Sequence, residues 1–223
     1  MLALRPNSAL SSDELIDGLW GERPPASAAK NLQLYVSRLR RALADSGSGA
    51  RIVTRGRGYE LQVGPDAVDA ARFERLIELA EREPDGGGPS GAAQAALELW
   101  RGTPLADVAD EPFARPEIRR LEELRLRAIE HTIDAELDAG RHGEAIARLE
   151  GLIAEHPLRE SLRAKRMLAL YRAGRQSEAL DAYRQARETL IEEIGVEPGP
   201  ELQQLQAAIL EQDPRLDLPA PKE

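Results

Sequence analysis

The chain has 223 residues, 31% of them charged and 42% hydrophobic, with a formal net charge of −9, which suits a globular protein of one large or two small domains. No apolar run reaches the roughly 18 residues of a membrane-spanning helix and no signal peptide is present, so we expect a cytoplasmic protein without membrane contact. The lack of cysteine excludes thiol chemistry, and three widely spaced histidines, His131, His142 and His156, leave no metal or cofactor to expect.

Charge is distributed unevenly along the chain. Residues 1–64 contain nine basic and six acidic side chains, whereas residues 65–223 contain 21 basic and 33 acidic ones. This asymmetry is typical of an anion-binding head on an acidic body. On charge alone, a chance imbalance among solvated side chains explains it equally well.

Residues 12–20 predict a short helix. It begins at Ser12, carries acidic residues in its first turn and is expected to end at Gly21. The Pro24-Pro25 pair then forces a turn. The apolar residues of the helix fall on one stripe: Leu15, Ile16, Leu19 and Trp20.

A longer helix is predicted over residues 28–44, with Ser27 as its cap. Its apolar residues step by four, three and four, which predicts one buried stripe of Leu32, Val36, Leu39 and Leu43. At about 100° per residue, the opposite face carries Lys30, Leu34, Ser37, Arg38 and Arg41. The flanks of that face are Asn31, Gln33, Tyr35 and Arg40.

Residues 51–63 predict a β-hairpin. Ile52 and Val53 lead into a turn made of residues 56–58, and apolar residues then alternate with polar ones over residues 59–63. The turn is expected to expose Arg55 and Arg57 at its tip.

The order of helix, turn, basic-faced helix and basic-tipped hairpin is that of a winged helix-turn-helix. In such a fold one helix face enters the major groove of DNA, and a hairpin arginine reaches the minor groove or a phosphate. Lysine and arginine neutralise phosphates, arginine binds guanine with two hydrogen bonds, and asparagine and glutamine pair with adenine. The residues alone leave a second interpretation open, in which a solvated amphipathic helix precedes an ordinary surface hairpin.

Three sequence blocks closely resemble the response-regulator type of winged helix. They are residues 12–21 (SDELIDGLWG), 36–43 (VSRLRRAL) and 54–61 (TRGRGYEL), in that family's order and spacing. The resemblance implies that the longer helix is the recognition helix and the hairpin is the wing, with Tyr59 packed under it. It implies contacts to the groove by Lys30, Asn31, Gln33, Leu34, Tyr35, Ser37 and Arg38, and to phosphate or minor groove by Arg41, Arg55 and Arg57.

The N-terminus departs from that pattern. The family has a strand platform and a whole first helix before this point, whereas residues 1–4 supply about one turn of it. We therefore expect a partial winged helix in which the apolar stripes are incompletely covered, at Leu15, Leu19, Leu32 and Leu39.

The body, from about residue 68, predicts almost only helix. Helices are expected over residues 70–83, 92–100, 117–139 and 200–212, with a glycine-rich break at 85–91. Residues 214–223 contain three prolines and are expected to be a disordered tail.

A repeat lies within this body. Gly140, Arg141, Glu144 and Ala145 each have an identical residue 34 positions later, at Gly174, Arg175, Glu178 and Ala179. Thirty-four residues is the period of tetratricopeptide repeats (TPR), in which stacked helical hairpins bury a continuous core. Two similar hairpins without a shared repeat ancestry are the alternative.

The body resembles the bacterial transcriptional activator domain. The resemblance rests on residues 69–76 (DAARFERL), 96–105 (ALELWRGTPL), 182–190 (AYRQARETL) and 192–202 (EEIGVEPGPEL). Together with the head, it makes the chain similar to the antibiotic-regulatory-protein (SARP) family of bacterial activators. That similarity implies binding to direct repeats near a promoter, contact with RNA polymerase, homodimer formation or other protein contacts through the body, and activation of secondary-metabolite genes.

The predicted architecture is therefore mainly α. It comprises a partial winged helix-turn-helix domain with a β-hairpin wing over residues 1–64, a TPR-like activator domain over 65–213 and a tail over 214–223. The favoured function is a DNA-binding transcriptional activator at the nucleoid. The alternative is a TPR-like protein-interaction adaptor with a truncated head that does not bind DNA. An enzyme is not expected, because neither a nucleophile–base pair nor a phosphate-binding glycine loop is found.

Overall fold

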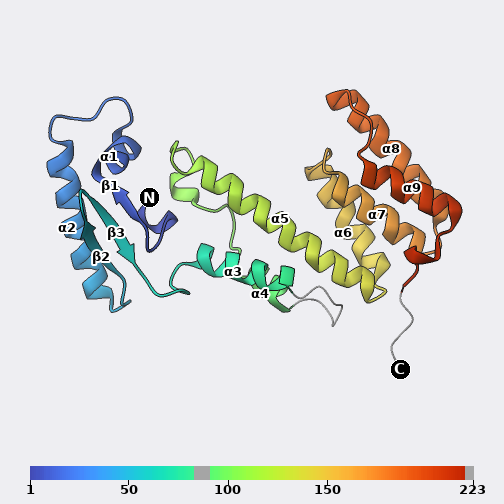
Figure 1. Ribbon diagram of the computed structural model, residues 1–223, viewed down its shortest axis with the longest axis horizontal. Helices are drawn as coiled ribbons and strands as arrows, with labels where there is room; N and C mark the ends of the chain where they lie inside the picture. Colours follow the sequence, from blue (N-terminus) through green and yellow to red (C-terminus); the bar gives the residue numbers. More distant parts are fainter. Residues whose placement is uncertain (83–90, 219–223) are drawn as a thin grey trace. The chain divides into compact units, whose positions relative to one another are not determined.

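The computed structural model describes residues 1–82 and 91–218, and its backbone divides into two compact units (Figure 1). Of the described residues, the first unit holds 1–81 and 95–127, and the second holds 82, 91–94 and 128–218. The expected glycine-rich break lies, apart from Gly91, outside the described residues. In chain order the elements are η1 (Leu2–Leu4), β1 (Ala9–Ser11), α1 (Ser12–Trp20), α2 (Ala28–Ser46), β2 (Arg51–Arg55), β3 (Gly58–Gln62), α3 (Asp69–Arg82), α4 (Gly91–Glu98), η2 (Ala106–Val108), α5 (Arg115–Asp138), α6 (His142–Glu155), α7 (Glu160–Arg172), α8 (Gln176–Ile194), α9 (Pro200–Glu211) and η3 (Pro214–Leu216).

The N-terminal part of the first unit, residues 1–62, is the predicted winged helix-turn-helix. Its sheet has the strand order β1-β3-β2 and is antiparallel throughout. Leu10 of β1 is opposite Tyr59, and Ile52 of β2 is opposite Leu61. The two helices α1 and α2 close over this sheet around a buried core of Leu10, Leu15, Leu32, Val36, Ile52 and Leu61.

Helix α1 begins with a capping box. The hydroxyl of Ser11 accepts a hydrogen bond from the Glu14 backbone nitrogen at 3.1 Å, and the Glu14 carboxylate accepts one from the Ser11 backbone nitrogen at 2.8 Å. The hydrogen bonds from the Ser11 backbone and hydroxyl, followed by the charge of Arg5, lower the pKa of Glu14. Gly21, with a φ of +58°, ends the helix as predicted.

Helix α2 ends at Gly47, which adopts the left-handed conformation. Ser27 precedes the helix as expected, but its side chain does not cap it. Its φ of −90° and ψ of 6° depart from the extended conformation of a capping residue. Its hydroxyl instead accepts a hydrogen bond from Asn31 Nδ2 at 3.2 Å.

The apolar stripe predicted on α2 is only partly buried. Leu32 and Val36 lie in the core, but Leu39 is 49% exposed, so the prediction of one buried stripe is wrong at this residue. On α1, Leu19 is 45% exposed although Leu15 is buried. The expected incomplete cover is thus confirmed at Leu19 and Leu39 and wrong at Leu15 and Leu32. Periodicity places a side chain on a face, but burial also requires an element opposite that face.

Strand β1 was not predicted. Its three residues are too few to show an alternating pattern, and it forms because β3 offers an unpaired edge. Ser11 is opposite Gly58 in this pairing. A Cβ atom on Gly58 would lie 2.1 Å from the Leu10 carbonyl oxygen, so the approach of the two strands requires glycine.

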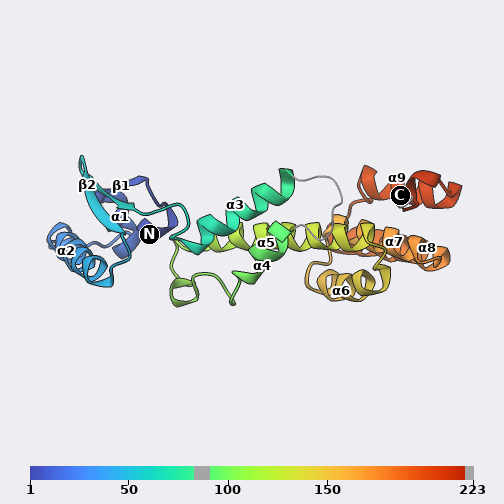
Figure 2. The same cartoon turned by 90° about the horizontal axis from the view of Figure 1, so that it is seen from below.

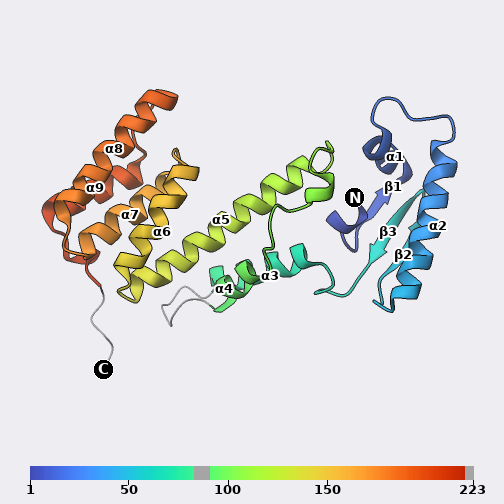
Figure 3. The same ribbon diagram turned by 180° about the vertical axis from the view of Figure 1, so that it is seen from behind.

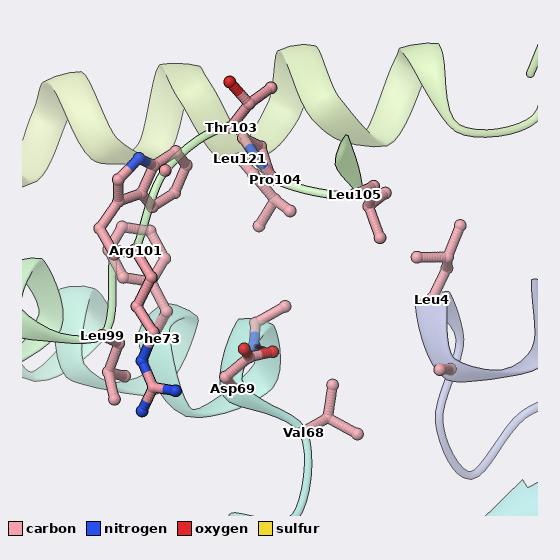
Figure 4. A pocket seen from close by; sticks show the side chains of 14 residues that line it. Leu4, Val68, Asp69, Phe73, Leu99, Arg101, Thr103, Pro104, Leu105 and Leu121 are labelled. Carbon is pink, nitrogen blue, oxygen red and sulfur yellow. Dashed lines mark hydrogen bonds between the residues drawn. The ribbon is translucent and has the colours of Figure 1, made fainter. Parts of the chain in front are cut away.

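The Trp100 side chain packs elements of the first unit together. Its ring centroid lies 5.6 Å from that of Phe73 on α3, and the Arg125 guanidinium of α5 lies 5.1 Å from the centre of its ring. Phe73 and Trp100 also line a cavity of about 320 Å³ (Figure 4). Helix α4 ends at Glu98 rather than at the predicted residue 100, because the Trp100 backbone nitrogen bonds to the carbonyl three residues earlier.

The second unit contains the 34-residue repeat. Gly140 and Gly174 both have a φ of +75°. The backbone nitrogens of Arg141 and Arg175, which follow them, each donate to the carbonyl five residues earlier at 2.9 Å, as in a Schellman motif. The matching small residues of the next helices are both fully buried: Ala145 in α6 and Ala179 in α8. The two hairpins therefore have the same joint and the same close helix contact.

A ladder of ion pairs links α7 to the C-terminal half of α5, which belongs to the same unit. Carboxylates four residues apart on α5 meet cations in ascending order: Glu130 with Arg159 at 2.8 Å, Asp134 with Lys165 at 2.5 Å and Asp138 with Arg172 at 3.5 Å. The ascending order shows that the two helices run parallel. Figure 2 shows α6 and α9 on opposite sides of α7.

The expected tail is ordered at its start. Residues Pro214–Leu216 form η3, and Arg172 Nε donates to the Leu216 carbonyl oxygen at 2.8 Å. The prediction of disorder from residue 214 is therefore wrong for this turn, because a side chain of α7 holds its backbone. Residues 219–223 lie outside the described part of the chain.

Alanine at Gly58 is expected to destabilise the head. The new Cβ would meet backbone atoms of β1, which can only move away, so we expect a loss of about 2 kcal/mol. Native-state hydrogen exchange of the β3 amides measures the change. The control Gly64→Ala has no atom within 4 Å of its Cβ and should leave exchange unchanged. Equal exchange in both variants would contradict this account of the β1–β3 contact.

The repeat glycines predict a pair of matched effects. Gly140→Ala and Gly174→Ala place a Cβ at a φ of +75° and should each destabilise the second unit by about 1 kcal/mol. Gly151→Ala, within α6, should stabilise it by about 0.5–1 kcal/mol. Thermal unfolding measures the change in stability for all three variants. If all three are stabilised, or all three are destabilised, the two joints have no special role.

Candidate nucleic-acid interface

Helix α2 turns most of the predicted residues away from the sheet. Lys30, Arg38 and Arg41 make no ion pair within the described residues, and the sequence between residues 28 and 44 contains no carboxylate. The outward face is therefore basic over its first four turns. Five predicted residues lie on it and are exposed: Lys30, Leu34, Ser37, Arg38 and Arg41.

The flanking residues of the predicted set have different surroundings. The Tyr35 ring stacks on that of Trp20, with centroids 6.2 Å apart and planes inclined by 21°. Asn31 is half-buried and bonds to Ser27, whereas Gln33 is exposed. Tyr35 and Asn31 thus have side-chain partners within the head, unlike the residues of the outward face.

Arg40 joins α2 to the hairpin. Its Nε donates to the Ile52 carbonyl oxygen at 2.8 Å, and its Nη2 donates to Thr54 Oγ1 at 2.9 Å. Its guanidinium also lies 5.9 Å from the centre of the Tyr59 ring, which is half-buried under the hairpin as expected. In the sequence, Arg40 stood on the flank of the helix without an assigned role. Its place between the buried stripe and the polar face was the signal that it bridges to another element.

The tip of the hairpin is held from the other side by α1. The turn between β2 and β3 has two residues, Gly56 and Arg57, with Gly56 at a φ of +54°. The Arg57 carbonyl oxygen accepts hydrogen bonds from the Ser12 backbone nitrogen at 2.9 Å and from the Ser12 hydroxyl at 2.7 Å. The Arg57 side chain is exposed. The turn is thus fixed in place while its cation remains accessible.

A chain of hydrogen bonds crosses the outer face of the hairpin. Arg51 Nε donates to Gln62 Oε1 at 2.9 Å, and Gln62 Nε2 donates to Glu60 Oε1 at 2.9 Å. Arg55 Nε donates to Glu60 Oε2 at 3.0 Å. The hydrogen bond from Gln62, followed by that from Arg55, lowers the pKa of Glu60. Sequence reasoning did not single out Glu60, because its partner is a diagonal neighbour on the other strand.

This arrangement suits binding of a polyanion. A helix presenting unpaired cations fits the major groove of B-DNA, and a fixed hairpin tip beside it can reach the adjacent backbone. Figure 3 shows α2 alongside the β2–β3 hairpin. Across residues 1–82 and 91–218, no group of three His, Cys, Asp or Glu side chains could hold a metal ion. Nor does any helix in that part of the chain have the length and apolarity to cross a membrane.

Two family profiles match the chain. The profile described as "Transcriptional regulatory protein, C terminal" matches residues 1–61. The profile described as "Bacterial transcriptional activator domain" matches residues 68–210.

Curated relatives and a solved structure cover nearly the whole chain. The chain is 44% identical over 219 residues to Regulatory protein AfsR of Streptomyces coelicolor, and this match covers 96% of this chain and 22% of AfsR. It is 42% identical over 232 residues to Regulatory protein DnrI of Streptomyces peucetius, covering all of this chain and 85% of DnrI. The solved structure of Mycobacterium tuberculosis EmbR in complex with a low affinity phosphopeptide has a TM-score of 0.89 and 35% identity, covering 96% of this chain and 58% of that one.

Removing the Arg40 side chain is expected to loosen the hairpin. Arg40→Ala deletes both hydrogen bonds to β2 and should lower the stability of the head by about 1 kcal/mol. Native-state hydrogen exchange of the β2 amides checks this. Arg41→Ala removes the same charge from the outward face of α2 and serves as the control. If both variants exchange alike, Arg40 does not hold the hairpin.

Proposed function

The chain belongs to the SARP family of bacterial transcriptional regulators, and on that premise we propose that it binds double-stranded promoter DNA and activates secondary-metabolite genes. In this proposal α2 lies in the major groove and the β2–β3 hairpin is the wing. The groove is contacted by Lys30, Asn31, Gln33, Leu34, Tyr35, Ser37 and Arg38, and phosphate or minor groove by Arg41, Arg55 and Arg57.

One observation carries the proposal: unpaired cations on α2 stand beside a hairpin that is fixed on two sides. Arg40 holds the hairpin to α2, and Ser12 holds its tip to α1. A surface that is ordered before binding loses less conformational entropy when it meets DNA. The arrangement therefore favours a specific DNA contact over a generally basic surface.

We propose a division of labour between residues 1–64 and 65–213. The first family profile ends at residue 61 and the second begins at residue 68, which supports this boundary. In the proposal the TPR-like body forms a homodimer and contacts RNA polymerase, and the protein acts without enzymatic activity at the nucleoid in the cytoplasm. Stacked helical hairpins offer extended surfaces for protein contacts.

The chain spans 22% of AfsR and 58% of the EmbR chain, and the phosphopeptide is a partner of EmbR.

One observation favours a second candidate function. Leu19 and Leu39 stay exposed in the head, and exposed apolar surface forgoes about 25 cal/mol of stabilisation per Å². If the head is only marginally stable, the function of the protein would reside in the TPR-like body. The protein would then be a protein-interaction adaptor that does not bind DNA.

A DNA titration separates the two candidates. A duplex selected by the wild-type chain from a randomised library is compared with a scrambled duplex at several salt concentrations, by fluorescence anisotropy. An activator should bind the selected duplex more tightly, with an affinity that falls steeply with salt. Failure to enrich any sequence, together with no salt-dependent binding, would leave the adaptor function.

Arg38→Ala is expected to weaken binding to the selected duplex by about 1–3 kcal/mol, because Arg38 is exposed on the outward face of α2. The loss on the scrambled duplex should be smaller. Arg119→Ala, which removes an exposed arginine of α5, is the charge-matched control. An equal loss on both duplexes would show that Arg38 contacts only the backbone.

Arg57→Ala is expected to weaken binding to both duplexes alike, because a cation at the hairpin tip meets phosphate. The slope of log affinity against log salt should become shallower by about one unit. The titration series described above measures this slope. An unchanged slope would remove the wing tip from the DNA contacts.

A further inference from the structure

Resting on the proposed function, we propose that Glu60 is a positioning residue for DNA binding: its carboxylate holds Arg55 in a fixed orientation for contact with the DNA backbone or minor groove. A carboxylate in a basic wing would ordinarily oppose a polyanion. Through its contact with Arg55 in the free protein, the Glu60 carboxylate instead supports DNA binding.

The register of the hairpin sets up this contact. Arg55 is directly opposite Gly58, and Glu60 is opposite Val53. Because Gly58 has no side chain, Arg55 has no side-chain partner directly across from it, and its contact is with the diagonal neighbour. Such diagonal pairs are within reach of long side chains in antiparallel sheets.

Glu60 is itself held in place. One carboxylate oxygen accepts from Gln62 and the other from Arg55, and Gln62 accepts in turn from Arg51. The Glu60 side chain is only 13% exposed. The hydrogen bonds from Gln62 and then from Arg55 lower its pKa, so they favour the charged carboxylate as acceptor. The carboxylate is therefore a fixed point on the hairpin.

The contact with Glu60 uses only the Nε atom of Arg55. Glu60 accepts from Nε, and within the described residues neither Nη1 nor Nη2 of Arg55 has a hydrogen-bond partner. The Arg55 side chain remains 58% exposed. Both terminal groups are thus available for a phosphate or a base edge, while the hydrogen bond from Nε restricts the orientation of the side chain before binding.

If Glu60 positions Arg55, removing its carboxylate should weaken DNA binding. If the carboxylate only repels DNA, removing it should tighten binding. Affinity for the selected duplex is measured for the wild-type chain, Glu60→Ala, Glu60→Gln and Arg55→Ala, and for Glu60→Ala combined with Arg55→Ala. We expect Glu60→Ala to bind about three- to tenfold more weakly, and Glu60→Gln, whose amide oxygen can still accept from Nε, to recover most of the loss. In the Arg55→Ala background the Glu60→Ala change should have no further effect.

A matched control removes an acid from the head without touching the wing. Glu22 is exposed in the segment between α1 and α2, and Glu22→Ala should bind as tightly as wild type or slightly tighter. Tighter binding by both Glu60 variants would show that the carboxylate only repels DNA and would overturn the proposal. So would a loss in Glu60→Ala that persists without the Arg55 side chain, because that loss would be structural.

A measurement without DNA separates this inference from the proposed function. In NMR spectra, the Arg55 Nε–H signal should be protected from solvent exchange in the wild-type chain and in Glu60→Gln, and unprotected in Glu60→Ala. Absence of protection in the wild-type chain overturns the Glu60 role whatever the chain binds. Protection without any salt-dependent DNA binding overturns the proposed function and, with it, the role of Glu60 in recognition.

Discussion

The head depends on the double pairing of β3. This strand is hydrogen-bonded to β1 on one edge and to β2 on the other, and Gly58 lies at the point where all three strands meet. The absence of a side chain there has two effects. It allows the β1 backbone to approach, which brings Leu10 into the core, and it leaves Arg55 without a side chain directly across from it. One small residue thus supports both the fold of the head and the arrangement of the wing.

Elements with a strong local pattern could be predicted from the sequence. Ser12 and Gly21 predicted the bounds of α1, and the spacing of Leu32 and Val36 predicted α2 to within a few residues. The hairpin was predictable from residues 51–63 for the same reason. Strand β1 was not predictable, because it depends on what lies opposite in space rather than on neighbours in the sequence.

The candidate site shows the same division between local and non-local information. Helical periodicity sufficed to place Lys30, Arg38 and Arg41 on one exposed face. The residues that hold the wing, Arg40 and Glu60, act through partners on other elements. Their roles follow from strand register and from the packing of α2 on β2, which composition and charge do not encode.

The two equivalent joints of the body bear on how such a protein can change in length. Gly140 and Gly174 close their helices with the same backbone angle and the same hydrogen bond, and the alanines five residues later are buried alike. A duplicated or deleted segment of one period would therefore begin and end at interchangeable junctions. Evolution can lengthen or shorten this body in whole hairpins, and the geometry of each remaining joint stays as it was.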